Sequence, residues 1–349
     1  MLRTSRAGIL LAAIAVATVL AGCTAATTTG SPKPSKSSPA PSAQALGCAD
    51  LASGADLAAA LGGTATPADP TTVALASSTD VTYATAVAAA GGLQCAWLGP
   101  AQDGFTPTLT VELLPDPQKQ WTAMLFGDGP SNETRTFGSH TVTAASGDPG
   151  YGASGRVGGT WAFIVRTFPP TGTPDPQAFD KLDPAFTSVL DAAAAKGSRL
   201  SLSEPSTGAG GCDQLLSVDR MSTALGGPAT YQVVDVPAAD RGIGEVAQAR
   251  VSDIRCFGMG ATQGLEFAVA HGGAPLLTKV RNGFDTVDLG AFTPTTLTGL
   301  AAGDWAIALP CGVRPGVCEV IFTHNGDVIQ VTQAPDPIAV AEAIIAQNL

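Results

Sequence analysis

The sequence predicts an α+β fold of two tandem similar domains, each an antiparallel sheet covered by an N-terminal and a C-terminal helix. Three observations predict this class. Residues 48–66 match residues 212–230 at nine of nineteen positions without a gap. Apolar residues alternate with period two after the second cysteine of each copy, which indicates strands with one buried face. Apolar residues recur at helical spacing where each copy opens and closes.

Length and composition bound the classes of protein that remain. A chain of 349 residues is long enough for two domains. Only 13% of the residues are charged and 45% are hydrophobic, so most of the chain is not a disordered polyelectrolyte. The formal net charge is −11 and no cluster of basic residues stands against it, which argues against a nucleic-acid partner.

The first 22 residues have the layout of a secretory signal. Arg3 and Arg6 give a positive start, and residues 7–22 contain Thr18 as the only polar side chain. This apolar run is shorter than the roughly 20 residues that a membrane helix needs. Residues 20–23, Leu-Ala-Gly-Cys, resemble the lipobox of bacterial lipoproteins. The resemblance implies cleavage before Cys23 and a diacylglycerol thioether on its sulfur. The alternative is an ordinary signal peptide with a chance cysteine.

The segment after the signal has the composition of a flexible tether. Of residues 24–46, 13 of 23 are Ser, Thr or Pro, without hydrophobic periodicity. We therefore expect lipidated Cys23 and a tether over residues 23–46, with the globular part beginning near Gly47. An acidic protein is not attracted to an anionic membrane, so acyl chains supply the anchoring, at about 0.8 kcal/mol per buried methylene. The expected location is the extracytoplasmic face of the cell membrane.

Six cysteines remain after Cys23, and in a chain exported to an oxidising compartment this even number fits three disulfides. Six cysteines alone allow 15 pairings. The repeat selects one of them, because its second cysteine follows the first at nearly the same distance in both copies. The last two cysteines then close a short local loop. The predicted bridges are Cys48–Cys95, Cys212–Cys256 and Cys311–Cys318.

Local patterns predict how each copy begins. Residues 50–61 and 213–225 have apolar side chains at helical spacing and are followed by glycine pairs, as helices often are at their C-terminal caps. Residues 109–113 and 265–269 alternate as half-buried strands.

Further strands and the closing helices complete each copy. Residues 161–165 read as a strand, and Asn325-Gly326 joins residues 320–322 to 328–331 as a hairpin. The expected closing helices are residues 177–195 and 337–347. We expect a linker at residues 197–211, between domains at residues 47–196 and 212–349.

The order of cysteine, leucine-bearing helix, glycine pair and second cysteine occurs twice. The residues that carry it are Cys48, residues 61–63 and Cys95, and again Cys212, residues 225–227 and Cys256. This arrangement resembles a group of actinobacterial lipoproteins, whose small secreted domains open in this way and cross-link that helix to a strand. The resemblance implies this fold and no particular activity.

The segments that resemble catalytic or ligand-binding motifs favour structural interpretations. The spacings G-x-S-x-G and S-x-x-K, typical of serine nucleophiles, do not occur. Residues 150–155 match G-x-G-x-x-G but lack the preceding strand and following helix of a dinucleotide site, so we expect a loop between strands. His271 and His324 precede Gly-Gly and Asn-Gly, which predicts exposed hairpin ends.

Metal sites are not favoured either. Zinc is the alternative use of six cysteines, yet no C-x-x-C pair occurs and the histidines, including His140, fall outside ligand spacing. Asp175, Asp180 and Asp183 suggest a calcium loop. Their place around prolines at a helix start instead favours carboxylates that are stabilised by unpaired amides. We expect neither metal nor cofactor.

These observations favour a monomeric, non-catalytic binding or scaffolding module of the cell envelope, anchored by lipid and contacting an envelope protein. The alternative is a carrier or sensor of an apolar small ligand or lipid held between helix and sheet, and an enzyme is third. A deep cavity under the amino-terminal helix would favour the carrier, and a filled core would favour the module.

The Cys311–Cys318 loop has no counterpart in the first copy, so the shared fold does not require it. A short bridge stiffens an exposed turn, and a preorganised loop loses less entropy when it binds. One hypothesis is that Arg314 and Pro315 contact a partner, with Arg314 as the polar anchor. The alternative is a staple for a long hairpin.

Overall fold

The computed structural model describes residues 45–76, 81–102, 104–116, 133–147, 150–167, 178–204, 211–232, 242–282, 292–311 and 316–347. Ala43–Leu349 form one compact unit. The predicted signal, Cys23 and nearly all of the tether lie outside the described residues, as do Asp175, Arg314 and Pro315. None of the helices in the described ranges is long and apolar enough to cross a membrane.

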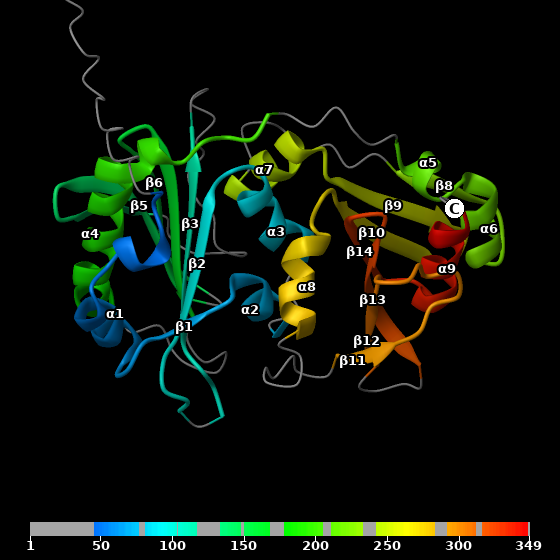
Figure 1. The fold of residues 1–349 in the computed structure, drawn as a ribbon, viewed down its shortest axis with the longest axis horizontal. Coiled ribbons are helices and arrows are strands. Elements are labelled where there is room, and N and C mark those ends of the chain that lie inside the picture. Colours follow the sequence, from blue (N-terminus) through cyan, green and yellow to red (C-terminus); the bar gives the residue numbers. More distant parts are fainter. Residues whose placement is uncertain are drawn as a thin grey trace, which may run out of the picture. The chain divides into compact units, whose positions relative to one another are not determined.

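Two antiparallel seven-stranded sheets form the framework (Figure 1). The first has the strand order β1-β2-β3-β7-β6-β5-β4. Its strands are β1 (Thr66–Ala68), β2 (Leu93–Leu98), β3 (Thr108–Pro115), β4 (Glu133–Phe137), β5 (His140–Gly147), β6 (Gly150–Val157) and β7 (Thr160–Thr167).

The second sheet repeats this order. Read from the β8 edge it is β8-β9-β10-β14-β13-β12-β11. Its strands are β8 (Ala229–Gln232), β9 (Ile254–Gly260), β10 (Gly264–Ala270), β11 (Thr293–Thr295), β12 (Ala306–Pro310), β13 (Val317–His324) and β14 (Asp327–Thr332). Each strand of one sheet therefore has a counterpart with equivalent neighbours in the other. The predicted α+β class with antiparallel sheets is confirmed.

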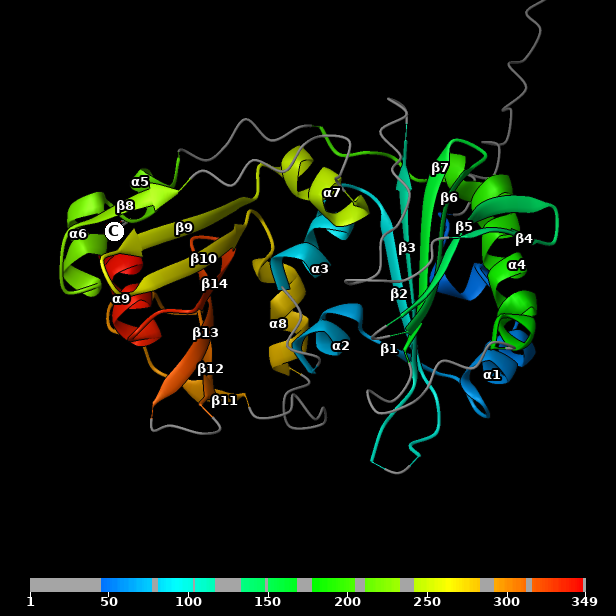
Figure 2. The same ribbon diagram turned by 180° about the vertical axis from the view of Figure 1, so that it is seen from behind.

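The helices lie on both sides of the sheets. We call the segment that contains the first sheet and the segment that contains the second sheet the two halves. The helices that open or close a half in the sequence are η1 (Cys48–Asp50), α1 (Gly54–Leu61), α4 (Ala178–Lys196), η2 (Gly197–Arg199), α5 (Cys212–Leu215), α6 (Val218–Ala224) and α9 (Pro337–Gln347). Helix α1 contacts α4, and α6 contacts α9 (Figure 2). Four further helices are α2 (Pro70–Ala76), α3 (Val81–Ala89), α7 (Ile243–Val251) and α8 (Ala274–Asn282). Helix α3 packs against α7, and α2 contacts α8.

The two opening helices are broken, where the sequence predicts continuous ones. Residues 50–61 divide between η1 and α1, and residues 213–225 between α5 and α6. The cause is a serine at the same repeat position. Ser53 accepts a hydrogen bond from the backbone amide of Asp56, and Ser217 from that of Arg220. Each serine is thus the N-cap of a second helix, which such side chains favour.

The closing helices are predicted to within one residue, whereas α2, α3, α7 and α8 are not predicted from the sequence. Helix α3 illustrates why such helices are not predicted from the sequence. It contacts α2, α7 and strands of both sheets, so it has no single apolar stripe facing one core. Its sequence, VTYATAVAA, also contains β-branched residues that lower helix propensity.

The glycine-rich residues 150–155 form part of strand β6, so the expected loop is wrong. A Cβ on Gly155 would lie 2.4 Å from Cγ1 of Val142 on the neighbouring strand, and one on Gly150 would lie 2.2 Å from the carbonyl oxygen of Arg166. These glycines permit close packing between neighbours in the sheet rather than a turn around phosphate.

The three disulfides have the pairing that the repeat predicts: Cys48–Cys95, Cys212–Cys256 and Cys311–Cys318. The first two join the opening helix of each half to the second strand of its sheet, β2 or β9. The third joins Cys311, the residue directly after β12, to Cys318 on β13. Two separate apolar cores lie beside the first two bridges, because Cys95 belongs to one core and Cys256 to the other.

Candidate functional site

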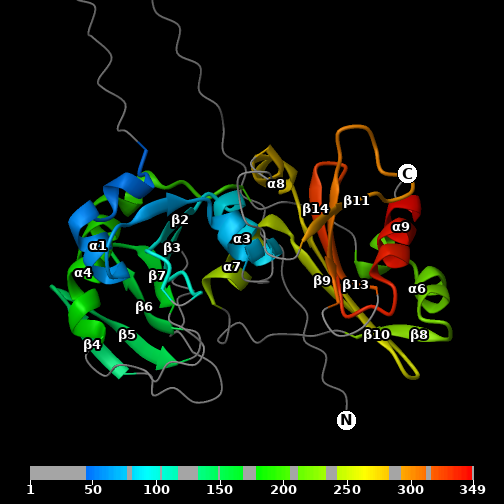
Figure 3. The same cartoon turned by 90° about the horizontal axis from the view of Figure 1, so that it is seen from below.

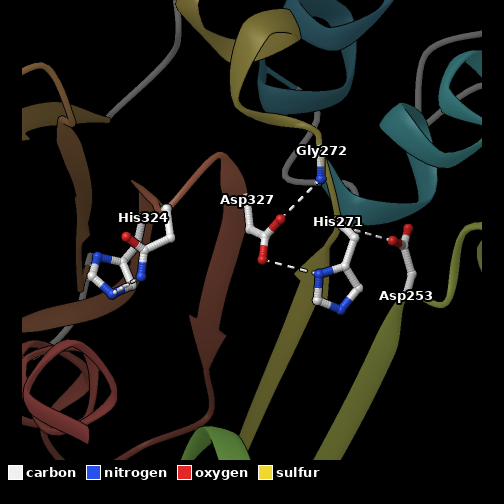
Figure 4. A network of polar contacts seen from close by, with 6 residues as sticks. Asp253, His271, Gly272, His324 and Asp327 are labelled. Carbon is white, nitrogen blue, oxygen red and sulfur yellow. Dashed lines mark hydrogen bonds and ion pairs between the residues drawn. The ribbon is translucent and has the colours of Figure 1, made fainter. Parts of the chain in front are cut away.

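Three polar side chains meet at one end of the second sheet (Figure 4). Asp253 lies between α7 and β9, His271 directly follows β10, and Asp327 is the first residue of β14. Strand β10 pairs with both β9 and β14, and these pairings bring the three residues together. We call Asp253, His271 and Asp327 the acid–histidine cluster.

His271 links the two carboxylates. Its backbone amide donates to Oδ1 of Asp253 at 2.8 Å, and its Nδ1 lies 2.9 Å from Oδ2 of Asp327. The amide of Gly272 donates to Oδ1 of Asp327 at 2.9 Å. Asp327 therefore uses both oxygens to hold the turn after β10. When Nδ1 carries the proton, Nε2 of a neutral His271 is the acceptor.

Burial shifts the protonation of the cluster. It raises the pKa of Asp253 to about 7, and the charge of Asp327 acts in the same direction. The hydrogen bond to Asp327 raises the pKa of His271, against the effect of burial. Among the described residues, Oδ2 of Asp253 and Nε2 of His271 are buried without a hydrogen-bond partner. The cluster can therefore hold or exchange a proton near neutral pH.

The first sheet serves as an internal control for this cluster. Cys95 pairs with Val111 as Cys256 pairs with Phe267, and the neighbouring strands keep equivalent registers. The counterparts of the cluster residues, in the order Asp253, His271 and Asp327, are Gly92, Pro115 and Thr160. The first sheet has the same strand order although it has these three residues in place of two acids and a histidine. The fold therefore does not require the acid–histidine cluster.

The histidines are less exposed than the sequence predicts. His324 ends β13 at the expected hairpin but is only 3% exposed, and the side chain of His271 is 19% exposed. His271 also leads into α8 rather than a hairpin. His140 lies on β5, with its Nε2 2.7 Å from Oδ1 of Asp191. No local signal marked Asp253 or Asp327, because their proximity depends on strand pairing.

The groups of the acid–histidine cluster can form hydrogen bonds and exchange a proton. The described cysteines are all held in disulfides. The described part of the chain contains no group of three or more His, Cys, Asp or Glu side chains arranged to hold a metal ion. Asp180 lies in the first turn of α4, where Oδ1 pairs with Arg135 at 3.0 Å.

Replacing Asp327 with alanine is expected to lower the free energy of unfolding by about 2–3 kcal/mol, because two donors lose their acceptor. Asp327→Asn keeps one acceptor oxygen and is expected to cost less. Urea unfolding at pH 6 measures both. Glu133→Ala, at an exposed acid on β4, is the control and is expected to change stability by less than about 0.5 kcal/mol. Equal losses for the three variants would contradict the described bonding.

Comparison of the chain with protein-family models, with curated proteins and with solved structures returned no match.

Proposed function

We propose that this protein is a lipid-anchored extracytoplasmic lipoprotein of the actinobacterial kind, and a non-catalytic binding or scaffolding module of the cell envelope. Residues 20–23 support the anchor, and the tether over residues 23–46 supports a globular part held away from the membrane. Three disulfides are in keeping with an oxidising compartment.

A tandem duplication supplies the architecture in this proposal, with domains at residues 47–196 and 212–349. Each is an antiparallel sheet covered by its opening and closing helices. The matching strand orders and the equivalent places of the first two disulfides support it. Two copies on one tether present two related surfaces, which suits a module that brings envelope components together.

The observation that carries the choice between module and carrier is the filled space under the amino-terminal helix. Leu57 and Leu61 of α1 are 5% and 0% exposed and belong to one core with Trp97 and Val111 of the sheet. In the second half, Met221 of α6 is equally buried in its core. A side-chain-filled interior leaves the binding role to the surface and favours the module.

Cys23→Ala is expected to move the protein from the membrane fraction to the soluble fraction or to block its maturation. The physical reason is that acyl chains on Cys23 supply the proposed anchor. Fractionation followed by immunoblotting measures the distribution, with Ser31→Ala in the tether as a matched control that stays membrane-bound. An alanine variant at position 23 that still sediments with membranes would exclude lipid anchoring at this residue.

Gentle detergent extraction of the native lipoprotein, followed by cross-linking and mass spectrometry, tests the binding role. If the protein is a binding module, we expect the same envelope protein to be cross-linked in repeated experiments to surface lysines such as Lys196. We then expect no apolar ligand at one molecule per chain. A lipid or other apolar compound retained at one molecule per chain, beyond the anchor itself, would establish the carrier instead.

A further inference from the structure

Helix α7 lies at the junction between the two halves of the compact unit (Figure 3). It packs against α3 and also contacts β3. One buried apolar cluster joins these elements, and its members are Ala86, Val87, Ala90, Leu114, Trp161, Ile243, Ala247 and Val251. In the middle of the junction, Nε2 of Gln248 donates to Oγ1 of Thr82 at 3.1 Å.

The amino-terminal end of α7 places one carboxyl group near another. The amide of Gly244 donates to the hydroxyl of Tyr83 at 3.2 Å. Glu245, in the first turn of α7, and Glu112, on β3, each have a buried Oε2 without a hydrogen-bond partner among the described residues. The other oxygen of Glu112 accepts from Nε2 of Gln94 at 3.2 Å. Burial raises the pKa of Glu112 to about 7, and the charge of Glu245 adds to this shift.

The carboxyl-terminal end of α7 leads into the acid–histidine cluster. Ser252 caps the helix in the left-handed conformation, and Asp253 follows it. Asp253 is held by the amide of His271 and has its other oxygen buried. Each end of the helix therefore meets a carboxyl group that has one buried oxygen and a pKa raised to about 7.

We propose that α7 is a proton-dependent latch between the two halves, docked on α3 in a mildly acidic medium and released as the medium becomes neutral to alkaline. The ionisable groups at its amino-terminal end are Tyr83 on α3, Glu112 on β3 and Glu245 on α7 itself. Those at its carboxyl-terminal end are Asp253, His271 and Asp327. Arg250 is the basic residue in the last turn of α7, and its Nε donates a hydrogen bond to the carbonyl oxygen of Ser203 at 2.7 Å. This latch does not depend on the proposed function.

The direction follows from proton linkage. In the docked state Glu112 and Asp253 keep their protons up to about pH 7, whereas hydrated carboxyl groups lose them near pH 4. Between these values the docked state binds more protons than the released state. Each unit of pH then favours release by up to about tenfold per group, and the effect levels off above pH 7.

Amide hydrogen exchange of the full-length protein tests the latch. After correction for the intrinsic pH dependence of exchange, protection of α7 is expected to fall at least about tenfold between pH 5.5 and 7.5. Protection of α4 and α9, which lie away from both carboxyl groups, is expected to stay constant. Unchanged protection of α7 over this range would overturn the proposal.

Glu112→Gln with Asp253→Asn replaces both groups by neutral amides, and the fall in α7 protection is expected to disappear. Glu319→Gln is the matched control, because Glu319 is a buried acid with a raised pKa on β13, and this variant is expected to keep the fall. A full fall in the double variant would overturn the latch. Near-ultraviolet circular dichroism shows whether the double variant is folded. If it is unfolded, the two single variants replace it, and each is expected to show a smaller fall in α7 protection than the unmodified protein. An undiminished fall in both single variants would also overturn the latch.

Discussion

Removing the Cys48–Cys95 bridge by Cys48→Ala and Cys95→Ala is expected to lower the free energy of unfolding by about 4 kcal/mol. The bridge spans 47 residues of sequence, so its loss restores a large conformational freedom to the unfolded chain. It also frees the opening helices η1 and α1 from strand β2. Urea unfolding of oxidised protein, compared with the variant, measures the difference.

The Cys311–Cys318 bridge provides the control within the same chain. It spans only 7 residues, and the same chain-entropy argument gives about 2 kcal/mol for its removal. Near-equal losses for the two double variants would show that local strain or residual structure, rather than loop closure, sets the contribution. A larger value for the Cys48–Cys95 bridge would agree with the presence of an equivalent bridge, Cys212–Cys256, in the other half.

Gly244→Ala is expected to destabilise the protein by about 2–3 kcal/mol through overpacking at the junction. A Cβ at this position would lie 1.9 Å from Cε2 of the Tyr83 ring. The two residues occupy equivalent places in α3 and α7 when the helices are aligned on Cys95 and Cys256. A large side chain in one copy thus fills the space left by a missing side chain in the other.

A double-mutant cycle tests this complementarity. Tyr83→Ala alone is expected to cost about 3 kcal/mol through the cavity it leaves, and Gly244→Ala in that background is expected to cost little. Thermal and urea unfolding of the four proteins give the coupling. Gly227→Ala is the control, since nothing lies within 4 Å of a Cβ there. Additive losses would contradict direct packing of Tyr83 on Gly244.

Repeats and local periodicity predict much of the fold. The repeat selects the three disulfides because equivalent cysteines recur at nearly equal separations. The Asn325-Gly326 turn predicts the hairpin of β13 and β14, in which His324 pairs with Asp327. Helices α4 and α9 follow from apolar spacing over long segments. In each case the signal lies within one segment or in a comparison of two similar segments.

Other features depend on what neighbouring segments do. Residues 150–155 look like a loop by composition, yet they form part of β6, where neighbouring strands approach Gly150 and Gly155 too closely for a Cβ. Helix α3 has no amphipathic stripe, because several elements surround it. Apolar spacing predicts continuous opening helices, and this prediction is wrong because capping by Ser53 and Ser217 outweighs the apolar spacing.

The sequence by itself determined the lipobox resemblance, the disulfide framework, the repeat and the hairpin, because each depends on residue types at short or repeated spacings. Only the tertiary structure decided that Asp253, His271 and Asp327 meet, and that Glu112 and Glu245 share a buried junction. Antiparallel pairing joins strands that are far apart in the chain, and burial then changes the protonation of carboxyl groups that composition counts as ordinary surface acids.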